Sequence, residues 1–136
     1  MKIQPYLNFN GQCDEAFALY EKVLGGKVLY RHAYGNSPMA AQVGAEWADK
    51  VMHTTMQVGD QMLLGCDAPP PHFQKPQGLR ICLEFEDAAE AERVYAGLSE
   101  GGQIGMAMQE TFWAVRFAMF QDRFGTPWMI NVGKPI

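Results

Sequence analysis

The chain has 136 residues, of which 48% are hydrophobic and 19% charged, and its formal net charge is −4. This balance is typical of one globular domain and excludes a disordered or fibrous chain. The basic residues form no run that could neutralise successive phosphates, and no apolar stretch approaches the ~20 residues that cross a bilayer, so neither nucleic acid nor membrane is an expected partner. The N-terminus lacks an apolar signal core, which predicts a cytoplasmic location.

The first half of the chain predicts a strand, a helix and three more strands. Residues 6–9 alternate between apolar and polar side chains, as a half-buried strand does. A helical stripe follows, made of Ala16, Phe17, Tyr20, Val23 and Leu24. The helix is expected to end at Gly25-Gly26, where a left-handed residue can close the last turn. Further strands are predicted at residues 28–34, 52–58 and 62–66, with a hairpin turn at Gly59-Asp60.

The second half repeats this order. A strand at 81–85 precedes a helical stripe of Ala91, Val94, Tyr95 and Leu98, and Asp87 with Glu90 forms a capping-box pattern. Strands follow at 104–108, 115–121 and 128–132. The spacing from Leu7 to Gly25 equals that from Leu83 to Gly101. We therefore predict an α+β fold in which two tandem β-α-β-β-β modules form a curved, cup-shaped mixed sheet with helices on its outer face.

Two segments fall outside this pattern. The proline-rich stretch 68–78 is the expected linker between a first repeat at 1–67 and a second at 79–136, within one domain. Residues 35–50 are irregular, and they are either a flap over a binding site or an ordered surface loop.

Strand alternation indicates which side chains line the cup. Tyr6 and Asn8 point away from the apolar positions of the opening strand. The second repeat places Arg80 and Glu84 in the same way, and Asn131 joins them from the last strand. These five residues are predicted to bind a ligand. Charged residues at Arg80 and Glu84 imply a wet or occupied cavity, or else an ion pair at a dimer seam.

An aromatic and basic pair, Trp113 and Arg116, completes the predicted ligand-binding set. An arginine beside aromatic rings can stack and still present its guanidinium to a carboxylate or phosphonate. The alternative is that Phe112, Trp113 and Phe117 pack in the core or in an interface.

The reactive side chains show no known catalytic or disulfide spacing. The three cysteines are widely separated, and the histidines at 32, 53 and 72 show no paired ligand spacing. Glu84 and His53 are the candidates for a general base.

Several motifs resemble one known family. They are the stretches 5–17, 50–53, 110–113 with Arg116-Phe117, and 122–131. Together they resemble the PhnB-like branch of the vicinal-oxygen-chelate superfamily, which includes glyoxalase I, fosfomycin- and bleomycin-resistance proteins and extradiol dioxygenases. Some members of the branch are labelled demethylubiquinone methyltransferases, but the sequence has no Gly-rich strand-to-helix turn for the nucleotide portion of a methyl donor.

The resemblance also implies where a metal would be held. Members that bind a metal place one ligand on each of four strands, and these positions fall on Gln4, on Asp67 or Gly65, on Arg80 and on Met129. Arginine has no lone pair to offer, and a thioether is a poor ligand for hard divalent ions. No cofactor is therefore expected. The alternative is a divalent metal held by Gln4 and Asp67, or by His53 with Asp67 or Glu84.

The function expected from the sequence is binding of a small, anionic or amphipathic molecule in the cup between the repeats. Two alternatives stay open: a metal-dependent enzyme of lyase, isomerase, dioxygenase or transferase type, and a dimeric interaction protein without catalysis. A homodimer is expected in each case.

Overall fold

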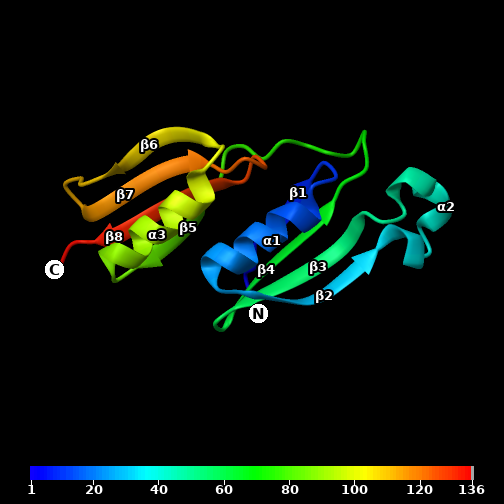
Figure 1. Ribbon diagram of the computed structural model, residues 1–136, viewed down its shortest axis with the longest axis horizontal. Coiled ribbons are helices and arrows are strands. Elements are labelled where there is room, and N and C mark those ends of the chain that lie inside the picture. Colours follow the sequence, from blue (N-terminus) through cyan, green and yellow to red (C-terminus); the bar gives the residue numbers. More distant parts are fainter. Residues whose placement is uncertain (136) are drawn as a thin grey trace. The chain divides into compact units, whose positions relative to one another are not determined.

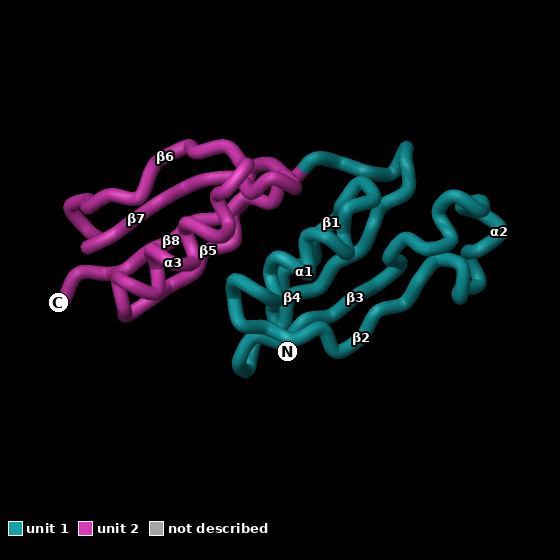
Figure 2. The backbone as a smooth tube through the Cα atoms, in the orientation of Figure 1, with its two compact units in different colours: residues 1–75 teal, residues 76–136 magenta. Residues whose placement is uncertain are grey.

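The computed structural model describes residues 1–135, which form two compact units (Figure 2). Unit 1 covers Met1–Lys75, and unit 2 begins at Pro76. The boundary between them lies within the proline-rich segment 68–78. None of the helices in residues 1–135 is long and apolar enough to cross a membrane.

Unit 1 is a four-stranded sheet with one long helix on one face (Figure 1). Its elements are β1 (Tyr6–Phe9), α1 (Cys13–Leu24), β2 (Lys27–Ala33), β3 (Val51–Val58) and β4 (Gln61–Asp67). The strand order is β1-β4-β3-β2, with β1 parallel to β4 and the other pairs antiparallel.

Unit 2 has the same connectivity. Its elements are β5 (Ile81–Phe85), α3 (Ala88–Ser99), β6 (Gln103–Gln109), β7 (Ala114–Gln121) and β8 (Pro127–Gly133). The order is β5-β8-β7-β6, again with one parallel pair, β5 and β8. The predicted pair of β-α-β-β-β modules is thus confirmed.

The segment that the sequence left as a flap or a loop contains three short helical turns. They are η1 (Tyr34–Asn36), α2 (Ala40–Val43) and η2 (Ala45–Trp47). Tyr34 is buried, its hydroxyl donates to the Asp67 carbonyl at 2.7 Å, and its ring meets Trp47 edge-on. The segment is therefore packed onto the end of β4.

The helix ends follow from their sequences, with one difference. Gly25 ends α1 in the left-handed region, with φ at 73°, and its N–H donates to the Glu21 carbonyl. Asp87 caps α3 by accepting from the Ala89 N–H at 3.0 Å. Glu90 pairs with Arg93 instead of closing the predicted capping box.

Each helix covers only one face of its sheet. In β1, Leu7 and Phe9 are buried beneath α1 while Tyr6 is 46% exposed. Gly65 of β4 lies so close to this helix that a Cβ there would come within 2.6 Å of the Phe17 ring. In β8, Trp128 and its alternate residues are buried in the same way. We call the other face, which no helix of the unit covers, the open face.

One buried carboxylate in each unit joins neighbouring elements. Asp67 is 1% exposed, and its two oxygens accept from the backbone N–H groups of Cys13 and Val51, each at 2.9 Å. It therefore ties the starts of α1 and β3 to the end of β4. In unit 2, Asp122 accepts from the Thr126 N–H and from the Trp128 indole at 2.8 Å.

We predict that Asp67→Asn destabilises the protein, because each carboxylate oxygen accepts from a different backbone N–H group and an amide would turn its NH₂ toward one of them. The expected loss is about 2–3 kcal/mol of unfolding free energy, measured by urea denaturation. Asp60→Asn, in the exposed β3–β4 turn, is the matched control and should lose little. Equal stability of the two variants would contradict this role for Asp67.

Candidate functional site

A one-residue bulge occurs at the same place in both edge strands, β2 and β6. In unit 1, Val28 lies opposite Met56, yet Tyr30 lies opposite the adjacent Thr55. In unit 2, Ile104 lies opposite Phe120 and Met106 opposite Met119. Each of these bulges adds one residue to the edge strand, so the side-chain alternation shifts by one at that point. Tyr30 and Met106 are thereby turned to the open faces.

The open face of unit 1 holds two rows of side chains that run across all four strands. One row contains Tyr6, Leu64, Thr55 and Tyr30, and the other contains Asn8, Cys66, His53 and His32. Directly opposite residues share a face, and alternation from the Thr54–Gly65 pair puts His53 and Cys66 on that same face, so these eight lie together. The rows include none of the carboxylates of the chain. We call this set the Tyr–His face.

Tyr6 and His53 form the central contact of the Tyr–His face. The Tyr6 hydroxyl lies 3.0 Å from Nδ1 of His53, and the two rings stack at 5.6 Å. Burial raises the pKa of Tyr6, so the hydroxyl stays protonated, and we assign it as the hydrogen-bond donor to Nδ1. Nε2 then carries the imidazole proton. In the described part of the chain this N–H has no hydrogen-bond partner.

His32 differs from His53, because both of its nitrogens are used. Nε2 lies 2.8 Å from the Asn36 carbonyl, to which it can only donate, and Nδ1 lies 2.6 Å from the Tyr30 hydroxyl. This histidine therefore anchors the turn after β2, while His53 offers a donor to the open face.

Asn8 supplies a second donor. Its Oδ1 accepts from the Cys66 thiol at 3.2 Å. Burial raises the pKa of Cys66, which keeps the thiol protonated and able to donate. The amide NH₂ of Asn8 is then directed away from that bond. The Tyr–His face thus offers two N–H donors flanked by aromatic rings.

The open face of unit 2 has a different character. Nδ2 of Asn131 donates to both oxygens of Glu84, at 3.1 and 3.0 Å, while its Oδ1 is buried without a partner. The Cys82 thiol lies 3.8 Å from the same carboxylate. Phe117 is opposite Asn131, and Trp113 packs edge-on against Phe117 with 5.1 Å between the ring centroids.

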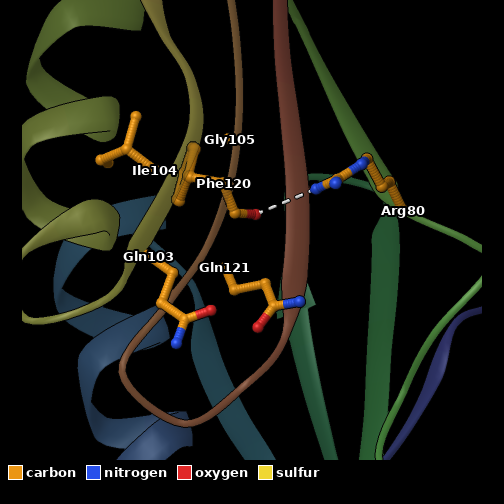
Figure 3. Close-up of a pocket in the computed structure, with 6 residues that line it drawn as sticks. All are labelled: Arg80, Gln103, Ile104, Gly105, Phe120 and Gln121. Atoms are coloured by element: carbon orange, nitrogen blue, oxygen red, sulfur yellow. Dashed lines mark hydrogen bonds between the residues drawn. The ribbon is translucent and has the colours of Figure 1, made fainter.

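Arg80 lines a small hollow near the start of β5. Its guanidinium donates to the carbonyls of Phe120 and Trp128 at 3.3 and 3.4 Å, rather than to Glu84. Figure 3 shows this side chain reaching toward the Phe120 carbonyl. The hollow measures about 130 Å³, and its other walls are Gln103, Ile104, Gly105 and Gln121.

The structure separates Arg116 from Trp113. Arg116 pairs with Glu92 of α3, with its Nε 2.7 Å from the carboxylate, so it lies on the helix-covered side. Trp113 instead contacts Phe112 and Phe117. An anion at Arg116 would have to compete with a carboxylate that is already bound.

The proposed metal ligands do not gather either. The Asp67 carboxylate faces α1 and β3, on the side opposite Tyr6 and His53. Gln4 precedes β1 and lies outside any strand. Within residues 1–135 there is no group of three His, Cys, Asp or Glu side chains that could hold a metal.

Of the residues proposed from the sequence, Tyr6, Asn8 and His53 lie on one face of unit 1, and Glu84 and Asn131 on one face of unit 2. The sequence did not indicate Tyr30, His32 and Cys66 as members of the first group. Strict alternation puts Tyr30 on the same side as Val28, and only the bulge reverses this. The two consecutive apolar residues Val28 and Leu29 break the alternation, and this was the sequence signal that could have indicated a bulge.

Comparisons with known proteins agree with this fold. A family described as 3-demethylubiquinone-9 3-methyltransferase matches residues 1–131. Protein YjdN of Escherichia coli is 36% identical over 142 residues, covering 98% of this chain and 97% of that protein. The crystal structure of PA1353 from Pseudomonas aeruginosa superposes with a TM-score of 0.89 at 41% identity, covering 99% of both chains. The PhnB protein from Bacillus cereus shares the fold, with a TM-score of 0.83 at 20% identity over 98% of this chain and 100% of that one.

Removing the Tyr6 hydroxyl should change the tautomer of His53. We expect Tyr6→Phe to cost Nδ1 its donor, worth about 1 kcal/mol, and so to shift the tautomer ratio roughly fivefold toward Nδ1–H. Imidazole ¹⁵N chemical shifts measure this ratio. Tyr30→Phe is the matched control, because it should alter His32 and leave His53 unchanged. Unaltered His53 shifts in Tyr6→Phe would contradict the assigned hydrogen bond.

Proposed function

Because the chain belongs to the 3-demethylubiquinone-9 3-methyltransferase family, within the PhnB-like branch of the vicinal-oxygen-chelate superfamily, we propose that it binds a small organic anion on the Tyr–His face. The observation that carries the proposal is the 3.0 Å hydrogen bond between the Tyr6 hydroxyl and Nδ1 of His53. With the hydroxyl assigned as donor, the Nε2–H of His53 has no partner among residues 1–135.

The polar groups of the face suit an anion. The two donors, on His53 and Asn8, stand on either side of Cys66 in one row. A carboxylate or phosphonate could accept from both, and charge-assisted hydrogen bonds are the stronger kind. No carboxylate in the rows opposes such a ligand.

The rings of the face suit an apolar body on the same ligand. Tyr6 and Tyr30 are 46% and 49% exposed, and both rings lie near the His53 imidazole, at 5.6 and 6.1 Å. Exposed aromatic rings beside polar groups favour amphipathic molecules. The expected ligand therefore combines an aromatic or aliphatic body with an anionic head. That the ligand lies in a cup between the repeats stays a prediction.

Catalysis is the second candidate. Neutral His53 with its proton on Nε2 is a hydrogen-bond donor at that atom, and it could serve as a base there only in the other tautomer. The reaction named in the family description would act on an aromatic ring oxygen, which the donors of this face could bind. Turnover of a methyl donor with a demethylated quinol would support this candidate.

Phenylphosphonate is the probe we choose for the binding proposal, since it joins an aromatic ring to a dianion. We expect saturable 1:1 binding by calorimetry, with the ligand recovered unchanged. His53→Ala should weaken binding about tenfold or more, the effect of losing one hydrogen bond to a charged group. His53→Gln keeps an N–H donor and should therefore recover part of the affinity lost in His53→Ala. Asn8→Ala, which removes the second donor, should also weaken binding.

His72→Ala, in the exposed proline-rich segment 68–78, is the matched control and should bind like the wild type. Arg116→Ala tests the other anion site and should also have no effect. Loss of binding in Arg116→Ala with none in His53→Ala would move the site to unit 2. No binding of phenylphosphonate by the wild type would refute the proposal.

We also propose that the chain is a homodimer in solution. The edge strands β2 and β6 carry exposed apolar residues, among them Leu29 at 52% and Ile104 at 48%, and pairing of chains can cover such edges. Light scattering should give about twice the chain mass of 15.2 kDa. A monomer mass at micromolar concentration would contradict this.

A further inference from the structure

Four sulfur-containing side chains form one continuous row across the sheet of unit 2. Cys82 of β5 lies opposite Met129 of β8, Met129 lies opposite Met119 of β7, and Met119 lies opposite Met106 of β6. Each of the four strands contributes one sulfur. The row is the counterpart of the Tyr6, Leu64, Thr55 and Tyr30 row of unit 1.

The row lies on the open face and is reachable. The three methionines are half-buried and Cys82 is exposed. Their alternate neighbours in β8, Trp128 and Ile130, are fully buried on the helix-covered side. Met106 belongs to the row only because the bulge at Gly105 turns it toward Met119.

The spacing of the row suits a single small ion. Directly opposite residues in a sheet have Cα atoms about 4.5–5.5 Å apart, and methionine is long and flexible enough for its sulfur to lean toward a neighbour. Three consecutive sulfurs can therefore meet at one point, whereas the fourth is too far along the row. In the set of three that includes Cys82, Met129 lies between Cys82 and Met119.

We propose that Cys82, Met129 and Met119 bind a soft monovalent metal ion, Cu(I) or Ag(I), on the open face of unit 2. Thiolate and thioether sulfur are the ligands that Cu(I) prefers, and they disfavour hard divalent ions. Three sulfurs from adjacent strands supply a trigonal set.

The charges around the row favour a cation. The Glu84 carboxylate lies 3.8 Å from the Cys82 sulfur, and Asn131 holds it in place with two hydrogen bonds. As the metal–sulfur bond forms, the Cys82 thiol releases its proton to solvent, so the site of one thiolate and two thioethers balances the single charge of the ion. No change of oxidation state is involved. The site shares no residue with the Tyr–His face and does not depend on the proposed function.

The test is a titration of the whole purified chain with Cu(I) under anaerobic conditions, in competition with a chromophoric Cu(I) chelator. We expect one ion per chain. Met129→Leu and Met119→Leu, which keep the side-chain volume, should each lower the affinity on the order of 10- to 100-fold. Cys82→Ser should lower it further. On addition of Ag(I), the ¹³C methyl resonances of Met119 and Met129 should shift.

Two variants serve as matched controls. Met62→Leu changes a half-buried methionine on the open face of unit 1, and Cys66→Ser changes the half-buried thiol there. Neither should alter the affinity for Cu(I). Wild-type affinity in Met129→Leu would mean that the row is only an apolar surface, and unshifted Met119 and Met129 methyl resonances would mean that a thiol alone binds the ion. Either result overturns the proposal.

Discussion

The extra residue in each edge strand is the constraint on which both open faces depend. A strand has a side-chain period of two, so one added residue moves every later side chain to the other side of the sheet. In β2 this shift places Tyr30 and His32 beside His53, and in β6 it places Met106 beside Met119. Without the shift, each row would end at the third strand.

Both repeats have this bulge, but the side chains that it brings together differ in chemistry. Position by position, the row of tyrosine, leucine, threonine and tyrosine in unit 1 corresponds to cysteine and three methionines in unit 2. The first face offers N–H donors and rings without a carboxylate, and the second offers sulfur and a carboxylate. Because the helix of each unit buries the opposite face, these differences lie outside the helix-covered core.

The buried carboxylates fix the ends of the strands whose side chains form the open faces. Asp67 bonds to backbone N–H groups at the starts of α1 and β3, and Asp122 fixes the turn before β8. Both side chains have the chemistry of a metal ligand or a catalytic acid. Their hydrogen bonds are already used within the fold, so acidic character alone would mislead a search for the site.

The sequence by itself determined the repeat, the helices and, where a strand is regular, the side of it that faces the core. These features follow from local periodicity and from glycines at helix ends, which act over a few residues. It also placed Tyr6 and Asn8 on one face of their strand, because that strand is regular, whereas His53 was named only as a candidate base or metal ligand. Only the tertiary structure decided which residues of neighbouring elements lie opposite one another. The bulges, the pairing of Arg116 with Glu92 and the row of sulfurs depend on the register between strands that are distant in the chain. No local pattern encodes that register, because it is set by the packing of whole elements.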